Sequence, residues 1–242
     1  MRLAGVRFAR SEFTRRVISA ELNKLSISGS TPRRYHAAWS SFGNFLVESE
    51  VLDANPLRSV KAPRPNSPRE ECLEMDDSMR LCNAQRAPYA ALAALREGAN
   101  VEISAALRTR RRDVDLERAT VHAHGTKNSY RDRLVIVDER AWPAIVKASS
   151  GKFPDALIFE GATEERARAE HKRALNTLGL SESYTMHDAR HSFAVRYMKA
   201  GVEPRIIANN LGHRDATMVL KLYGRYSPTS VDLRRAQLRR AK

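Results

Sequence analysis

The residues best suited to act together in chemistry gather between positions 187 and 226. Arg190 and His191 stand three and four positions after His187, so on a helix the three side chains share one face. His213 follows a second predicted helix, and Tyr223 lies ten positions beyond it. A metal site is a weak interpretation of these histidines, because no carboxylate or cysteine stands at ligand spacing and an arginine among them would repel a cation.

Such a set suits attack on a phosphodiester. The planar guanidinium of an arginine can hold two non-bridging phosphate oxygens, and histidines donate hydrogen bonds or move protons near neutral pH. A tyrosine hydroxyl is a competent nucleophile once its proton is removed, and a lysine can protonate the departing 5′ oxygen. Because protein cations supply the charge stabilisation, the sequence predicts neither a metal nor a cofactor.

The composition agrees with a polyanionic partner. The 242 residues include 42 Lys or Arg against 28 Asp or Glu, a formal net charge of +14, and 42% are hydrophobic. This balance favours nucleic acid as the partner of a globular protein, with an anionic membrane surface as the second candidate. Cys72 and Cys82 have no second pair to complete a zinc site, and no apolar run is long enough to span a bilayer. We therefore expect a protein of the bacterial cytoplasm or nucleoid, without a membrane partner.

The elements that must position these residues are mostly helices. Helical patterns are predicted near 74–85, 88–97, 100–110, 139–149, 163–178, 187–200, 204–212 and 215–222. Between them, 119–124 and 131–137 predict two strands joined by a hairpin loop over 125–130.

A smaller helical unit is predicted before them. Thr31 can cap a helix that has Pro32 at its first position and runs to about residue 50. Its apolar face consists of Tyr35, Trp39, Phe42 and Leu46. An amphipathic stretch over 11–25 can pack against this face. The proline-rich residues 61–69 are interpreted as an interdomain linker, with an ordinary surface loop as the alternative.

Several stretches resemble the conserved boxes of the tyrosine recombinase (phage integrase) family. Residues 186–194, Met-His-Asp-Ala-Arg-His-Ser-Phe-Ala, resemble its second box, and 211–223, from Leu-Gly-His to Lys-Leu-Tyr, resemble its C-terminal box. Gly125-Thr-Lys127 between the two predicted strands is similar to its β-hairpin lysine motif, and Asp-Val-Asp at 113–115 also fits. The resemblance covers essentially all of 71–226, and the N-terminal unit, through 52–56, is similar to the family's core-binding domain.

The resemblance implies a nucleophile and a phosphate clamp. Tyr223 would form a 3′-phosphotyrosine link to DNA, and Arg190 would hold the scissile phosphate. Tyr226 is a rival nucleophile, but its spacing after Gly212-His213 does not match the family and that of Tyr223 does.

Three further roles follow from the same resemblance. His187 would accept or donate a proton beside the phosphate, and His213 would donate a hydrogen bond to it. Lys127 would be the general acid for the 5′ hydroxyl, although a solvated lysine at a hairpin tip is the alternative.

One position departs from the family pattern. The family has Thr-Gly-x-Arg, with its first catalytic arginine eleven residues before the Asp-Val-Asp, and counting back from Asp113 reaches Glu102. The loss of one oxyanion donor typically costs about 10²–10³ in rate. Arg96 or Arg108 could replace the missing arginine; otherwise the chain would be a slow recombinase, or would bind and bend sites without cutting them.

Other basic residues are candidates for DNA backbone contacts, with solvated faces as the alternative. They are Arg33, Arg34, Arg108, Arg110, Arg131 and Arg133. For the tail arginines at 234, 235, 239 and 240 the family resemblance implies a contact with a neighbouring subunit, and another solvated face is the alternative.

The expected fold class is therefore mainly α with a small β-sheet. A helical, SAM-like core-binding domain would occupy 1–62, a linker 63–70, and a tyrosine-recombinase catalytic domain with a C-terminal tail 71–242. No arm-type DNA-binding domain fits ahead of Arg15, which predicts a simple integrase. The implied partners are double-stranded DNA attachment sites, three further copies in a homotetramer on synapsed sites, and a directionality factor or a host DNA-bending factor.

Three rival interpretations stay open. A non-catalytic DNA-binding regulator on the same fold is supported by Glu102. A type IB topoisomerase-like enzyme would use the same site residues to relax supercoils. A basic helical RNA-binding protein is disfavoured, because aromatic residues make up only 7% of the chain and no stacking platform is visible.

Overall fold

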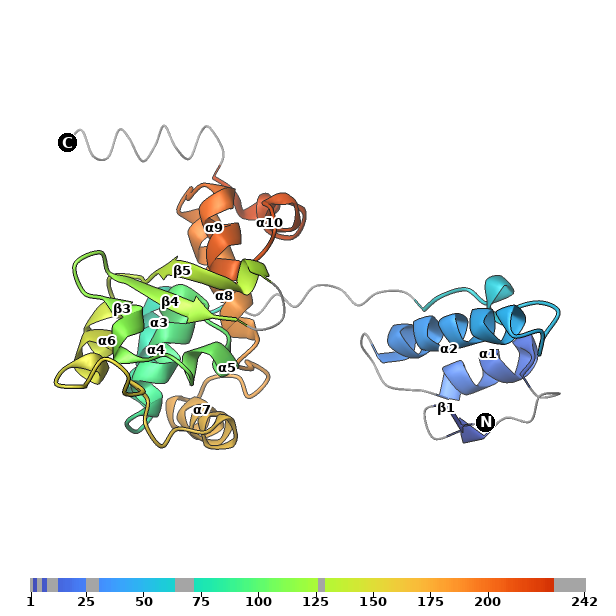
Figure 1. The fold of residues 1–242 in the computed structure, drawn as a ribbon, viewed down its shortest axis with the longest axis horizontal. Helices are drawn as coiled ribbons and strands as arrows, with labels where there is room; N and C mark the ends of the chain where they lie inside the picture. Colours follow the sequence, from blue (N-terminus) through green and yellow to red (C-terminus); the bar gives the residue numbers. More distant parts are fainter. Residues whose placement is uncertain are drawn as a thin grey trace. The chain divides into compact units, whose positions relative to one another are not determined.

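The computed structural model of the protein describes residues 2–3, 6–7, 13–24, 31–63, 72–125 and 129–228. The chain divides into two compact units, Met1–Glu70 and Glu71–Lys242 (Figure 1). The described residues are mainly helical, with one short hairpin in the first unit and a three-stranded antiparallel sheet in the second. The predicted fold class is confirmed. Most of the expected linker, Lys127 and the tail arginines lie outside the described residues.

The first unit is a small helical body. Strands β1 (Arg2–Leu3) and β2 (Val6–Arg7) precede α1 (Arg15–Lys24), α2 (Thr31–Glu48) and the 3-10 helix η2 (Pro56–Ser59). Trp39 and Leu46 of the predicted apolar face are buried on α2, where they pack with Ile18 of α1. Arg33 and Arg34 are exposed in the first turn of α2, so their guanidiniums face solvent.

The second unit is built around α4 (Tyr89–Ala99). This helix packs against α3 (Met75–Asn83), α6 (Trp142–Ser149) and α8 (Asp188–Lys199), and α7 (Glu164–Leu178) packs on α3. Leu92, Leu95 and Ala99 have at most 1% of their surface exposed, so α4 is buried on nearly every side. The buried helix α4 therefore holds in place the turn that follows it, which leads to Glu102 in the candidate site.

The sheet packs on the same core. Its strands are β3 (Val114–Asp115), β4 (Thr120–His124) and β5 (Asp132–Ile136), in the order β3-β4-β5. Val121 and Ala123 of β4 and Val135 of β5 point into the core, whereas the alternate residues of each strand do not. Two of these strands were predicted; β3 is too short to show a period.

The predicted helix over 100–110 is mostly wrong. Only α5 (Ile103–Ala106) is α-helical there, followed by the 3-10 helix η3 (Arg111–Asp113). Asn100 ends α4 in the left-handed conformation, with φ 57° and ψ 38°, which breaks the helix before Glu102. In the family pattern this position is the glycine of Thr-Gly-x-Arg. Asparagine is one of the few other residues that adopt this conformation readily, so the turn is made without the glycine.

Three C-terminal helices form a second core of their own. They are α8, α9 (Pro204–Leu211) and α10 (Thr217–Tyr223), and the 3-10 helix η5 (Gly224–Tyr226) follows. Phe193 of α8, Leu211 of α9 and Val219 of α10 are buried together, and the three helices lie side by side (Figure 1). The last residue of α10 is thereby held against α8. Within the described ranges, the search for a membrane-crossing helix found none of sufficient length and hydrophobicity.

Candidate active site

Helix α8 brings two of the predicted residues to the start of one helix. His187 is its N-cap and is exposed, while Asp188 is buried and accepts hydrogen bonds from the Thr185 backbone and hydroxyl at 2.7 and 2.6 Å. These bonds fix the first turn of α8. Arg190, within that turn, donates from Nη2 to the Leu211 carbonyl at 2.6 Å and to Nε2 of His213 at 2.9 Å. Arg190 thus connects the stretch over 186–194 with the stretch over 211–223 through direct hydrogen bonds.

His213 is placed by the end of α9. Gly212 has φ 62°, and a Cβ added there would lie 2.9 Å from Arg133 Nη1, so glycine is needed for both conformation and space. Burial lowers the pKa of His213, and the charges of Arg190 and Arg131 lower it further. Because arginine can only donate, Nε2 of His213 accepts from Arg190, which leaves the ring proton on Nδ1. That nitrogen is buried and has no partner among the described residues, so it is a donor available to a phosphate oxygen.

Tyr223 is packed within its own chain. Its side chain is 7% exposed, and its ring centroid lies 5.2 Å from that of His191. Burial raises the pKa of Tyr223, whereas the nearby charge of Arg190 lowers it. The rival Tyr226 is half-buried in η5, where Arg225 lies over its ring. The phenol of Tyr223 therefore belongs to the same site as Arg190.

Glu102 lies at the centre of a group of arginines. Its Oε1 is 2.7 Å from Arg131 Nη1 and 3.6 Å from Arg190 Nη1, and its Oε2 is 3.4 Å from Arg133 Nη1. One carboxylate thus faces three guanidiniums, so the group keeps a net positive charge. Burial lowers the pKa of Arg190 and of Arg133, while the charge of Glu102 opposes that shift; both remain charged.

Arg133 is not a solvated strand residue. Its side chain is 4% exposed, and Nη2 donates to the Asn210 carbonyl at 2.6 Å. Asn210 is itself buried and donates to the Ile136 carbonyl, and Asn100 donates to the Asn210 carbonyl. This network ties β5, the end of α4 and α9 together, so it fixes Glu102 and the arginines relative to α9.

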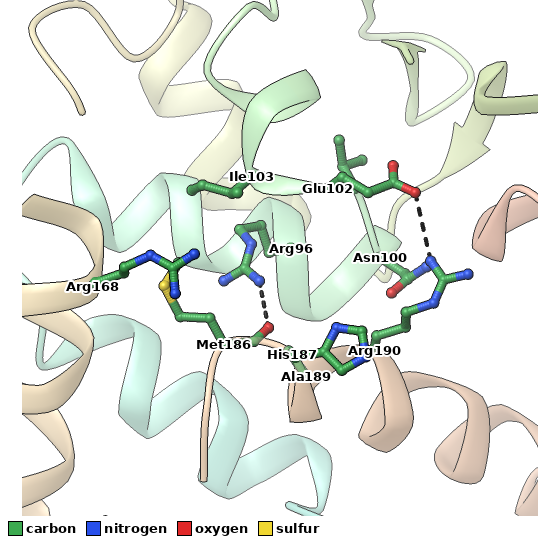
Figure 2. Close-up of a pocket in the computed structure, with 10 residues that line it drawn as sticks. Arg96, Asn100, Glu102, Ile103, Arg168, Met186, His187, Ala189 and Arg190 are labelled. Atoms are coloured by element: carbon green, nitrogen blue, oxygen red, sulfur yellow. Dashed lines mark hydrogen bonds and ion pairs between the residues drawn. The ribbon is translucent and has the colours of Figure 1, made fainter. Parts of the chain in front are cut away.

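A pocket of about 200 Å³ opens beside this group (Figure 2). Arg96, Glu102, His187 and Arg190 line it, and Figure 2 shows the ion pair between Glu102 and Arg190 on one side and Arg96 bonded to the Met186 carbonyl on the other. Arg96, one candidate for the missing first arginine, is thus held by a backbone carbonyl across the pocket from Arg190.

The other candidates for DNA contacts lie elsewhere. Arg108 is exposed and donates to the His124 carbonyl at 2.8 Å, so it borders the hairpin rather than the arginine group. Arg110 donates to the Asp155 carbonyl, and the neighbouring Arg112 forms an ion pair with the Asp155 side chain. The basic run over 108–112 is therefore largely engaged with the protein itself.

Sequence reasoning named Arg131 only as a candidate DNA contact and His191 only as a member of the helix cluster, and it missed Asn210. Arg131 and Asn210 join the site through partners far away in the chain, which spacing cannot reveal. His191 had a signal, because it stands four positions after His187 on the same helix, and the structure places its ring against Tyr223. Its Nε2 is buried with no partner among the described residues.

Comparison with known proteins assigns the family. Residues 73–229 match the model of the phage integrase family. The chain belongs to that family. Residues 73–229 contain the two box-like stretches over 186–194 and 211–223 and the hairpin, and the chain is an enzyme of the tyrosine recombinase family.

Curated relatives of the integrase are distant. It is 30% identical over 191 residues to a tyrosine recombinase XerC of Rhodospirillum centenum, covering 72% of this chain and 55% of the relative. It is 28% identical over 220 residues to the XerC of Xanthomonas axonopodis pv. citri, covering 85% and 70%. An integrase/recombinase of Escherichia coli is 27% identical over 255 residues, covering 84% and 74%.

Solved structures share the fold of the integrase. A lambda integrase dimer bound to a COC′ core site, residues 75–356, superposes with a TM-score of 0.70 at 16% identity, covering 88% of this chain and 84% of that one. The Tn1549 transposon integrase in complex with a circular intermediate DNA gives a TM-score of 0.68 at 14% identity, covering 95% and 86%. At these identities the likeness establishes the fold alone.

Proposed function

We propose that this tyrosine recombinase cleaves and rejoins double-stranded DNA at attachment sites and thereby integrates or excises a phage or another mobile element. Tyr223 attacks the scissile phosphate and forms a 3′-phosphotyrosine, and the 5′ hydroxyl leaves. Rejoining reverses these steps, with a 5′ hydroxyl of the partner strand as the nucleophile. The bond energy is conserved in the phosphotyrosine, so no nucleotide cofactor is consumed.

One arrangement carries this proposal: Arg190 of α8 donates to His213, and the ring of Tyr223 packs against His191, the neighbour of Arg190 on the same helix. The guanidinium binds the scissile phosphate, and the free Nδ1–H of His213 donates to a non-bridging oxygen. His187, exposed at the pocket rim, takes up the phenol proton or passes it on. Lys127, three residues after His124, is the general acid for the 5′ hydroxyl.

Arg131 takes over part of the role of the missing first arginine. Arg131 and Arg190 both approach Oε1 of Glu102. A phosphate oxygen would be bound well at the position of this carboxylate oxygen, because two guanidiniums face it. When DNA binds, the phosphate competes with Glu102 for these guanidiniums. The reaction is therefore slower than in a site with arginine at 102, but it is not abolished.

The active assembly is a homotetramer on two synapsed sites, in which pairs of strands are exchanged in turn. The lambda integrase structure is a dimer on one core site, which is half of such an assembly. A directionality factor or a host DNA-bending factor would decide between integration and excision. Arg33, Arg34 and Arg108, all exposed, contact the DNA backbone in this assembly.

The decisive experiment traps the covalent intermediate. A nicked attachment-site duplex releases a short strand on cleavage and so prevents rejoining; the wild-type protein should form a covalent complex whose linked peptide, by mass spectrometry, contains Tyr223. Tyr223→Phe should form none while binding the site as before, and Tyr226→Phe, the matched control, should still form it. A complex that depends on Tyr226 instead would overturn the assignment of the nucleophile.

A second candidate function is a DNA-binding regulator without cleavage. Glu102 favours it, because the carboxylate already holds the arginines that a phosphate needs. The regulator would be established, and the recombinase excluded, if the wild type and Glu102→Arg both bind the site specifically and neither forms a covalent complex.

A further inference from the structure

The outer face of the hairpin stem carries a compact group of histidines and aspartates. His122 and His124 alternate with buried residues along β4, so both side chains stand on the face that points away from the core. Their ring centroids are 4.2 Å apart. Asp132 is the residue paired with His124 across the sheet, at the first position of β5.

The nitrogen and oxygen atoms of this group converge. Oδ1 of Asp132 lies 2.9 Å from Nε2 of His122 and 3.3 Å from Nδ1 of His124. Ligands held about 2.0–2.1 Å from a tetrahedral ion are separated from one another by roughly 3.3 Å. The separations of Asp132 from the two histidine nitrogens therefore already match two edges of a metal coordination sphere.

A fourth residue supports this arrangement from behind. Nε2 of His124 lies 3.0 Å from Oδ1 of Asp113, whose side chain is 6% exposed. The other oxygen of Asp113 accepts the backbone N–H of Arg110 at 2.8 Å, which fixes the carboxylate. A histidine that binds a metal through one nitrogen commonly donates its other N–H to a carboxylate held in this way. Asp113, His122 and His124 each offer a ligand atom within 4.8 Å of the others, so Asp113 is also within reach.

Hydrogen bonds alone account for the group less well. His124 faces a carboxylate oxygen with each of its two nitrogens, so making both contacts as hydrogen bonds requires a proton on both. With a cation bound to Nδ1, a neutral ring satisfies both contacts, because Nε2–H donates to Asp113.

We propose that His122, His124 and Asp132 bind a divalent first-row transition ion, for which Zn²⁺ is the natural probe, with Asp113 orienting His124. Two imidazoles and one carboxylate are a donor set suited to such ions, and the exposed side chains leave coordination positions for water. The face is opposite to that of Arg133, which points into the core toward Glu102. The ion is thus separate from the phosphate-binding arginines and takes no part in the proposed cleavage.

The proposed ion would brace the hairpin. It ties β4 to β5 at the cross-strand pair His124–Asp132, next to the loop that carries Lys127. The effect is structural and is independent of whether the proposed recombination occurs.

Calorimetric titration of untagged, chelator-treated protein with Zn²⁺ tests the site. The wild type should bind one ion per chain with sub-micromolar affinity, and Co²⁺ should give the absorption bands of a tetrahedral or five-coordinate site. His122→Ala, His124→Ala and Asp132→Asn should each abolish this binding. Asp113→Asn should weaken it by about 10- to 100-fold, as expected of a residue that orients a ligand.

Matched controls are His36→Gln and Asp155→Asn, a histidine and an aspartate outside the group, which should leave one ion bound. Circular dichroism of each variant verifies folding, and Zn²⁺ should raise the thermal midpoint of the wild type and not that of His124→Ala. Absence of saturable binding to the wild type, or equal binding by the folded His122→Ala and His124→Ala proteins, would overturn the proposal. Neither result depends on DNA cleavage.

Discussion

Oε1 of Glu102 accepts a hydrogen bond from Arg131 Nη1 at 2.7 Å, although Glu102 caps α5 and Arg131 lies 29 positions later, at the end of the short 3-10 helix η4 (Ser129–Arg131) between β4 and β5. The same oxygen is 3.6 Å from Arg190. The site therefore contains an internal anion that competes with the anion of the substrate.

Neutralising this anion should accelerate cleavage. Glu102→Gln keeps the shape of the side chain but removes the charge that competes with phosphate, and we expect covalent complex formation on the nicked duplex to rise roughly 10- to 100-fold. The single-turnover rate at saturating protein measures this effect. Glu117→Gln, an exposed control on the turn after β3, should leave the rate unchanged. A lower rate in Glu102→Gln would mean that the carboxylate orients the arginines productively.

Removing Arg131 should slow cleavage far more than binding. If its guanidinium stabilises the pentacoordinate state, Arg131→Ala should lower the single-turnover rate about 10²–10³-fold. Arg108→Ala, which removes an exposed arginine of the same hairpin region, should change the rate little and weaken site binding at low salt. Equal effects of the two variants on the rate would contradict the special role of Arg131.

Cleavage should occur in cis. Tyr223 packs against α8 of its own chain, so each subunit should attack the phosphate that its own Arg190 holds. Mixing Tyr223→Phe subunits with Arg190→Ala subunits should restore no covalent complex. Recovery of about a quarter or more of the wild-type yield, the order expected when random mixing pairs complementary subunits, would show donation of the tyrosine in trans.

Stability should fall as the pH drops below neutral. Burial lowers the pKa of His171, His191 and His213 in the folded protein. As the pH falls through the ordinary histidine pKa, about 6.5, the unfolded chain takes up protons that the folded chain does not. The free energy of unfolding therefore decreases, and this decrease stops once the pH is below the lowered pKa values of the folded protein. The urea midpoint should therefore decrease from pH 7.5 to pH 5. His171→Gln, which removes the most buried of the three, should flatten this dependence; an unchanged slope would contradict the assignment.

Replacing one partner of the buried ion pair of Arg196 and Glu97 should lower the free energy of unfolding more than replacing both partners. Their side chains are 7% and 5% exposed, and Arg196 also donates to the Ser78 hydroxyl and the Leu73 carbonyl. Arg196→Met leaves the carboxylate of Glu97 buried without its cation, and should lower the free energy of unfolding by about 3–5 kcal/mol. Arg196→Met combined with Glu97→Gln should recover part of this loss in urea titrations. Additive losses would contradict the coupling.

The predictable part of the site is the part that is local in sequence. His187, Arg190, His213 and Tyr223 lie on or beside the ends of three consecutive helices whose periodicity and caps are visible in the chain. In the structure Arg190 contacts His213, and Tyr223 packs against His191 of the helix that carries Arg190. Counting residues also located the departure at Glu102. These inferences needed only spacing and residue type.

The partners of Glu102 could not be predicted, because they depend on how β4 packs against α5 and β5 against α9. The strand pattern left Arg131 and Arg133 open as solvated residues, and only the fold turns both toward the carboxylate. The helix expected over 100–110 failed for a related reason. Its apolar spacing was favourable, but Asn100 adopts the left-handed conformation and ends α4 before Glu102, while its side chain donates to the Asn210 carbonyl.

In the family pattern Thr-Gly-x-Arg, one short motif supplies both the backbone turn and the charged side chain of the site. In this chain Asn100 makes the turn, separately from the charged residue at position 102. Because it makes the left-handed turn by itself, the path of the chain into α5 does not depend on which side chain follows at position 102. The charge at the centre of the site can thus be inverted or restored by a single exchange, with no redesign of the scaffold. We therefore expect the rate of recombination to change with the residue at position 102 while the fold stays the same.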